Sequence, residues 1–129
     1  MKLALGHFKQ ELIKDYNELN LRMFDIGVKS QKVEILGNKI LIFANHKRIP
    51  SLKHLDEFNR LVTRMTDVAI IDSHKEHFKD LVEKKYKMKV ISILKDYDPF
   101  MELAVTIILL DKDVSQYISK QSDWSNELV

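Results

Sequence analysis

Apolar side chains recur at helical spacing near the start of the chain. They stand three or four positions apart, at Leu5, Phe8, Leu12, Tyr16, Leu19 and Met23. Charged residues such as Lys9 and Glu18 occupy positions between them. Because one side of such a helix is apolar and the other polar, the pattern predicts an amphipathic helix over residues 3–23. We expect this helix to end before Gly27, since glycine favours helix termination.

The pattern then changes to the period of two that is typical of a strand. Polar and apolar residues alternate over Lys32–Ile35. After Leu36 comes Gly37-Asn38, two residues that tolerate positive φ in a tight turn. Lys39–Asn45 is therefore predicted to be the return strand of a β-hairpin. Its centre, Ile40–Ala44, is apolar on both faces, so we expect both sides of this strand to contact protein.

A long helical segment follows at residues 51–85. Pro50-Ser51 marks its start, with Ser51 as the candidate N-cap. The apolar stripe shifts phase near Ser73, and Ser73 with Glu76 has the spacing of a capping box. The segment is therefore either one helix with a phase slip or two helices that meet near Ser73. A single helix would measure about 50 Å and outreach a small sheet, so we expect a bend there, or a projecting end that packs on a second subunit.

A second hairpin follows the long helical segment. Strands are predicted over Met88–Leu94 and Met101–Leu110, joined by a turn at Lys95–Phe100 in which Asp and Pro residues favour tight backbone geometry. The rest of the chain is polar, with a few scattered apolar side chains. The sequence thus predicts one domain over residues 1–113 and a polar C-terminal tail at 114–129.

The resulting order of elements is helix, hairpin, helix, hairpin. The two halves resemble each other, which has two explanations: an ancient duplication of one helix–hairpin unit, or the same burial rules acting twice. With either origin the order predicts an α+β fold. We expect a two-layer domain of α-β-β-α-β-β order with a four-stranded, mainly antiparallel sheet.

Composition narrows the classes of function. The 129 residues include no cysteine, which excludes disulfides, thiolate metal sites, iron–sulfur clusters and cysteine nucleophiles. This fits a reducing compartment, so we expect a cytoplasmic location. A net charge of +2 gives no case for a nucleic-acid or membrane-surface protein. No segment approaches the roughly 20 apolar residues of a membrane span. We expect no signal peptide, since residues 1–7 contain no apolar stretch long enough for one.

Histidines and carboxylates are the residues that could carry chemistry. His74 and His77 would face one side of a helix and could approach one ion, but a metal site needs at least two further ligands. We therefore predict no metal site, and we expect His7, His46 and His54 to be surface or capping residues. Carboxylates gather at the ends of the second hairpin, at Asp96, Asp98, Glu102, Asp111 and Asp113.

Turn chemistry explains the carboxylates near the second hairpin without any function. A calcium loop would need a central glycine, which this segment lacks. The glycine-rich phosphate-binding motifs and the GxSxG nucleophile motif are also missing. We predict no catalytic residue and no cofactor.

Two local strings, together with the order of elements, carry a resemblance to a known family. They are Lys32–Gly37 (KVEILG) and Lys89–Asp96 (KVISILKD). With them, residues 5–111 resemble the MpsC-like family of short bacterial domains, as a divergent member in which Gly27 alone matches the glycine-rich segment before the first strand. The resemblance implies an accessory role beside a cation-translocating or inorganic-carbon uptake system in the membrane.

The strands with two apolar faces predict more buried surface than two helices can cover, which favours a two-fold homodimer. We expect a non-enzymatic interaction or accessory module, in a possible complex with membrane transport proteins but not itself membrane-spanning. One alternative is a small-molecule or anion-binding regulatory domain, whose ligand would contact Gly27, Lys29, Ser30 and Asp96. A second alternative is an enzyme whose site the sequence does not reveal.

Overall fold

The computed structural model describes residues 2–118 of the chain. Its elements follow one another in the order α1 (Lys2–Phe24), β1 (Ser30–Leu36), β2 (Lys39–Asn45), α2 (Pro50–Phe58), α3 (Arg60–Tyr86), β3 (Val90–Asp98), β4 (Leu103–Leu110) and α4 (Val114–Ile118). Apart from the division of the central helical segment into α2 and α3 and the short α4, this is the predicted α-β-β-α-β-β order.

The four strands form one antiparallel sheet in the order β1-β2-β4-β3. The predicted Gly37-Asn38 turn is present, since Leu36 pairs with Lys39 and Gly37 has a φ of 63°. These observations confirm the α+β fold with its antiparallel sheet. Each hairpin contributes its second strand to the centre and its first strand to an edge, which is the arrangement that a duplicated helix–hairpin unit would give. The duplication itself stays a prediction.

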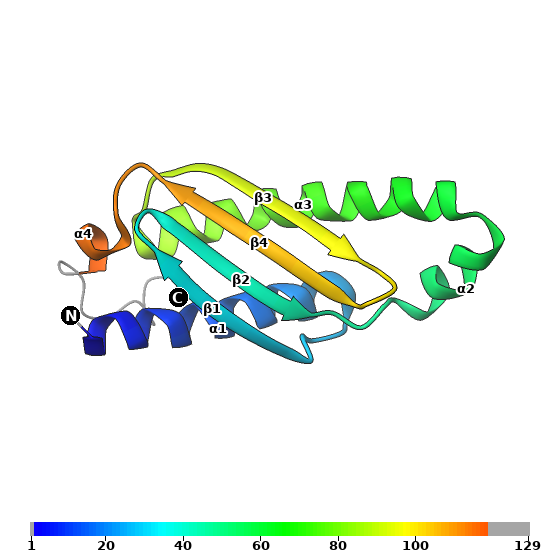
Figure 1. Cartoon of the computed structure of the whole chain (residues 1–129), viewed down its shortest axis with the longest axis horizontal. Helices are drawn as coiled ribbons and strands as arrows, with labels where there is room; N and C mark the ends of the chain where they lie inside the picture. Colours follow the sequence, from blue (N-terminus) through cyan, green and yellow to red (C-terminus); the bar gives the residue numbers. More distant parts are fainter. Residues whose placement is uncertain (1, 119–129) are drawn as a thin grey trace.

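The core lies between the sheet and the two long helices, which both run behind the sheet in Figure 1. Its largest fully buried side chains come from both helices, from the strands, from α4 and from the connection between α3 and β3: Tyr16, Tyr86, Phe8, Phe78, Leu12, Ile40, Ile42, Met88, Ile108, Leu110 and Ile118. Because strand side chains alternate between faces, each strand also presents a second set of residues on the opposite side of the sheet. None of the helices described covers that side.

The predicted break near Ser73 is wrong. The helical segment divides at Asn59, whose side chain accepts a hydrogen bond from the backbone N–H of Val62 and so caps α3. Ser73 lies inside α3, and its carbonyl oxygen is 2.8 Å from Nδ1 of His77. The predicted cap at Ser51 is also wrong, because α2 begins one residue earlier at Pro50 and has no side-chain cap. Proline is well suited to a first helical position, where no N–H is needed.

The first part of this helical region projects beyond the sheet (Figure 1). We call residues 50–72, which are α2 and the first half of α3, the arm. The 27 residues of α3 extend over about 40 Å. The arm carries exposed apolar side chains at Leu55, Phe58, Leu61, Val62, Met65 and Val68. The predicted projecting end is thus present, and its packing on a second subunit stays a prediction.

The turn of the second hairpin lies later in the chain than predicted. Strand β3 continues to Asp98, so Lys95, Asp96 and Tyr97 belong to a strand and not to a turn. The turn begins after Asp98. The Oδ1 of Asp98 accepts hydrogen bonds from the backbone N–H of Phe100 at 3.0 Å and from that of Met101 at 3.1 Å. The prediction failed because it took the acidic residues as turn formers, whereas their neighbours maintain strand alternation.

The start of the predicted tail packs into the core. Val114 and Ile118 of α4 are at most 1% exposed and belong to the same apolar cluster as the helices and strands. The remainder of the predicted tail, residues 119–129, lies outside the described residues. Within residues 2–118, no helix is both long and apolar enough to cross a bilayer.

Candidate functional site

The four residues predicted to contact a ligand do not come together. Lys29 and Ser30 are exposed at the start of β1, and Asp96 is exposed on β3 at the opposite edge of the sheet. Of the four, Gly27 is among the residues that line the pocket described next. A Cβ at Gly27 would lie 2.9 Å from Oδ1 of Asn17, an atom that already accepts a hydrogen bond from the N–H of Val28. Glycine is therefore required there for close packing of the loop on α1.

The pocket lies among α3, the loop after α1, and the ends of β2 and β3, and has a volume of about 60 Å³. Apolar side chains form much of its wall, among them Phe24, Ile26, Ile70 and Ile71. The polar residues that line it include Asn20, His46, His74 and Lys95. An apolar cavity with a few converging polar groups is the common form of a small-molecule site. This volume suits a ligand of a few heavy atoms.

A hydrogen-bonded chain of Lys95, Tyr16 and His46 runs beside the pocket. The Nζ of Lys95 donates to the hydroxyl of Tyr16 at 2.6 Å and lies 3.3 Å from Oγ1 of Thr106. The same hydroxyl is 2.8 Å from Nε2 of His46. Since an ammonium group can only donate, the Tyr16 hydroxyl accepts a hydrogen bond from Lys95 and donates one to Nε2 of His46. These residues belong to β3, α1 and the segment after β2, so the chain ties the helical layer to the sheet.

His74, on α3, is 1% exposed, and neither of its ring nitrogens has a hydrogen-bond partner within residues 2–118. Its ring lies edge to face against Tyr16, with 5.2 Å between ring centroids. Asn20 is equally buried; its Nδ2 donates to the carbonyl oxygen of Tyr16 at 2.7 Å, but its Oδ1 has no partner in the same part of the chain. An unpaired buried polar atom costs about 1–3 kcal/mol. The pocket therefore contains unused hydrogen-bonding capacity.

Burial lowers the pKa of three of the basic groups that line this pocket. It lowers the pKa of Lys95 to about 7. Burial, followed by the positive charge of Lys95, lowers the pKa of His46 to about 3 and that of His74 to about 2. Both histidines are therefore neutral near pH 7, and Lys95 is close to its titration midpoint.

A second interior lysine has very different neighbours. Lys85 of α3 is 5% exposed and donates to Oε2 of Glu11 at 3.1 Å and to Oδ1 of Asp15 at 2.8 Å. The hydroxyl of Tyr86 donates to the other oxygen of Asp15. Burial alone would lower the pKa of Lys85, but the hydrogen bonds and charges of Asp15 and Glu11 reverse this and hold the pKa above its ordinary value. This cluster joins α1 to α3 and leaves its lysine fully paired.

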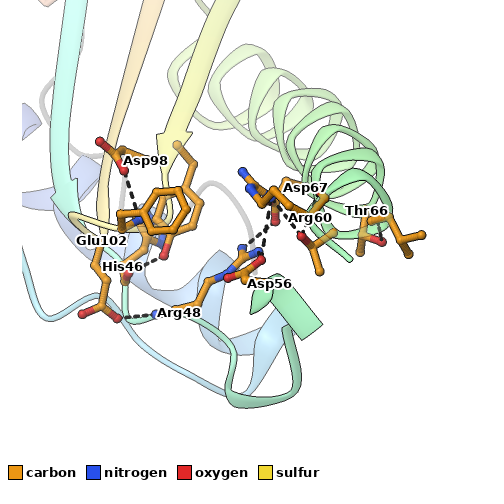
Figure 2. Close-up of polar contacts among 12 residues, drawn as sticks. His46, Arg48, Asp56, Arg60, Thr66, Asp67, Asp98 and Glu102 are labelled. Carbon is orange, nitrogen blue, oxygen red and sulfur yellow. Dashed lines mark hydrogen bonds and ion pairs between the residues drawn. The ribbon is translucent and has the colours of Figure 1, made fainter. Parts of the chain in front are cut away.

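A third charged group fixes the arm to the end of the sheet (Figure 2). The guanidinium of Arg48, which is 3% exposed, donates two hydrogen bonds to Asp56 of α2, at 3.0 and 2.7 Å, and one to Asp67 of α3 at 2.6 Å. Arg60 also contacts Asp67, with 3.3 Å between nitrogen and oxygen. The hydrogen bonds and charge of Arg48 lower the pKa of Asp56. Bidentate pairing of this kind restricts geometry, so the base of the arm has a defined position.

The structure separates the two histidines that the sequence placed on one helix face. His74 faces the pocket, whereas His77 is exposed and lies against the backbone of its own helix. In residues 2–118 no three His, Cys, Asp or Glu side chains are grouped so that they could hold a metal ion. The prediction that His46 is a surface or capping residue is wrong, because it is half-buried and hydrogen-bonded to Tyr16.

The side of the sheet that faces away from α1 and α3 is a second candidate surface, which we call the open face. Its centre is apolar and consists of Leu41 and Phe43 from β2, Leu94 from β3, and Val105, Ile107 and Leu109 from β4. Charged residues lie at both edges, with Lys32 and Glu34 on β1 and Asp96 and Asp98 on β3. An apolar centre with a charged rim is the usual composition of a protein–protein interface.

The sequence pattern indicates the burial of two pocket residues, although the sequence analysis did not use it. His74 stands on the same helical stripe as Phe78 and Leu81, which predicts burial. Lys95 has the same strand parity as Ile93 and therefore faces the core. Neither signal identifies a pocket by itself, because the pocket is assembled from segments far apart in the sequence.

Comparison with known proteins adds no relative. No family model matches the chain, and neither a curated protein nor a solved structure matches it. The resemblance to the MpsC-like family therefore stays a prediction.

Proposed function

We propose that the chain is an interaction module, not an enzyme, that works as a two-fold homodimer formed through the open face of its sheet. The observation that carries this proposal is the apolar centre of that face, which no helix of residues 2–118 covers. Leu94 of this centre is 53% exposed, and Leu103, at 41% exposure, extends the same apolar surface. Contact with a second copy would remove this surface from water, which is the main driving force of association.

The charges at the rim of the open face are self-complementary, and this supports a second copy as the occupant. One row across the sheet consists of Lys32, Phe43, Val105 and Asp96, from one edge strand to the other. A two-fold axis parallel to the strands stacks this row on its own reverse. Lys32 then faces the partner's Asp96, and Asp96 faces the partner's Lys32.

This axis also determines where the arms lie. Because the axis runs along the strands, both arms leave the dimer at the same end. The alternative axis in the interface plane, perpendicular to the strands, would place β1 on β1 and direct the arms to opposite ends. Charge complementarity between Lys32 and Asp96 favours the first arrangement.

Light scattering on the purified chain tests the dimer. We expect twice the mass of one chain, and we expect Ile107→Lys to give a folded monomer, since it places a charge at the centre of the open face. The matched control is Leu61→Lys, which puts the same charge on an exposed arm residue and should stay dimeric. A wild-type monomer at high concentration, or a dimer that survives Ile107→Lys but not Leu61→Lys, would refute the open-face interface.

A charge exchange tests the axis. Lys32→Asp and Asp96→Lys should each weaken the dimer by a few-fold to about tenfold, because rim pairs contribute about 0.2–1 kcal/mol each and like charges repel. The double variant should recover the wild-type dissociation constant measured by sedimentation. Failure of the double variant to recover would exclude the contact of β1 with the partner's β3.

The setting in which this dimer acts comes from the MpsC-like resemblance alone. It implies an accessory role beside a membrane cation or inorganic-carbon transport system. Purification of the tagged chain together with co-expressed membrane proteins of such a system tests this. We expect wild type and the Leu61→Lys control to retain the transport proteins and the Ile107→Lys monomer to lose them, and wild type that retains none would exclude the role.

A further inference from the structure

The pocket contains a cation that lacks a counter-charge. Lys95 is partly buried and donates only to neutral groups, the hydroxyl of Tyr16 and Oγ1 of Thr106. No carboxylate of residues 2–118 is within ion-pair distance of its ammonium group. The acidic residue in the pocket wall, Asp67, is already paired with Arg48 and Arg60. An interior charge without a partner is unfavourable, so this arrangement needs a further explanation.

Lys85 shows what the same chain does with an interior lysine that has only a structural role. Two carboxylates, Glu11 and Asp15, lie within 3.1 Å of its nitrogen. Around Lys95 the corresponding contacts are the hydroxyl groups of Tyr16 and Thr106. The imidazole of His46 lies beyond Tyr16, and a cavity lies beside the cluster. The protein supplies carboxylates to Lys85 but none to Lys95, and the cavity beside Lys95 has space for an anion.

His74 provides a second and independent observation. It is 99% buried and lines the pocket, and both of its ring nitrogens lack a partner within residues 2–118. A neutral imidazole has one N–H donor. The pocket therefore offers a donor from His74 in addition to the remaining N–H of Lys95, which uses two of its three on Tyr16 and Thr106. Two donors that line one small cavity match the two oxygens of a carboxylate.

We propose that the pocket binds a small carboxylate-type oxyanion, held by the ammonium group of Lys95 and the ring N–H of His74. The apolar side chains of Ile26, Ile70 and Ile71 exclude water around the charged contact and strengthen it. The free Oδ1 of Asn20 accepts from a hydroxyl on the same anion, so a hydroxy acid binds better than the plain acid. The pocket lies on the helix side of the sheet and not on the open face, so this proposal does not rest on the dimer.

Calorimetry and thermal unfolding of the full chain at pH 6.5 test the site, with sodium formate, acetate and glycolate as probes. Sodium chloride at the same ionic strength is the reference. We expect formate and acetate to raise the melting temperature by several degrees at about one hundred times their dissociation constant, and glycolate to do so at lower concentration. Affinity should fall as the pH rises above about 7, since deprotonated Lys95 no longer attracts an anion.

Two variants and one matched control decide whether the pocket is responsible. Lys95→Met and His74→Phe should each reduce affinity at least tenfold, while both keep the circular dichroism spectrum and the mass of the parent. His77→Phe changes the exposed histidine of the same helix and should bind as the parent does. The proposal is overturned if none of the probes binds wild type beyond the chloride reference. Unchanged affinity in Lys95→Met, or equal losses in His74→Phe and His77→Phe, would overturn it as well.

Discussion

The two interior lysines of this chain lie in contrasting surroundings, although both contact α1. Lys85 is closed in by Glu11 and Asp15, and its charge is fully neutralised by the protein. Lys95 contacts the hydroxyl of Tyr16, with neutral His46 beyond it and an unpaired His74 nearby. The charge of Lys85 therefore has a structural role, whereas the charge of Lys95 is available to a ligand. The first holds two helices together, and the second lines a cavity that a small anion can enter.

The largest effect should come from removing each lysine in turn. Lys85→Met leaves two buried carboxylates without a cation and should lower the free energy of unfolding by about 3–5 kcal/mol. Lys95→Met removes a charge that has no counter-ion and should stay within about 1 kcal/mol of the parent. Urea unfolding of both variants at pH 7 measures this. Equal losses of unfolding free energy in the two variants would mean that both lysines contribute equally to stability.

The second effect is the dependence of stability on alkaline pH. The pKa of Lys95 is lowered to about 7 in the folded chain from an ordinary value of 10.5. Between these values the unfolded chain binds more protons, so the contribution of Lys95 makes stability rise with pH, by up to about 1.4 kcal/mol per pH unit. The difference in unfolding free energy between parent and Lys95→Met should therefore change across this range. A constant difference would show that Lys95 titrates normally.

A third experiment converts the open cluster into a closed one. His74→Glu places a carboxylate beside Lys95 and should imitate the pairing that Lys85 has. We expect the variant to lose stabilisation by formate and to lose the alkaline slope, because the internal carboxylate occupies the anion site and raises the pKa of Lys95. His77→Glu, on the exposed side of α3, is the control and should behave as the parent. Continued binding of formate by His74→Glu would contradict the assignment of Lys95 to the anion.

The smallest effect should come from a partly exposed lysine with an acidic partner. Lys75 lies 3.6 Å from Asp72 on the surface of α3. Lys75→Ala should change the free energy of unfolding by less than about 0.5 kcal/mol, since water and salt screen such pairs. Urea unfolding at low and high salt would detect a larger value. A large value here would mean that burial is not what distinguishes Lys85.

The sequence pattern predicted the elements well and their boundaries poorly. Helix–hairpin order, the turn at Gly37 and the antiparallel sheet follow from local periodicity. The division at Asn59 was missed because Phe58 and its apolar neighbours on the arm continue a helical stripe, which the sequence pattern reads as one buried face. In the structure of residues 2–118 these side chains are exposed. Ser73 has the spacing of a cap, but Asn59 supplies the cap that the backbone uses.

The pocket could not be predicted because it depends on contacts between distant segments. Burial of His74 and Lys95 is visible in the periodicity of α3 and β3. That they line one cavity follows only from the packing of α3 against β3 and α1. Of the residues predicted to bind a ligand, Gly27 lines the pocket, and Lys29, Ser30 and Asp96 lie elsewhere on the surface.

Because α3 is one continuous helix, a small rotation about its middle moves its start by a larger distance. His74 lies in the middle of the helix, and Arg60 at its start is about 21 Å away along the axis at 1.5 Å per residue. A rotation of the helix by about 5° around His74 would move the start of α3 by about 2 Å. The hydrogen bonds of Arg48 to Asp56 and Asp67 oppose such a rotation, so a filled cavity beside His74 moves the arm only if these bonds adjust.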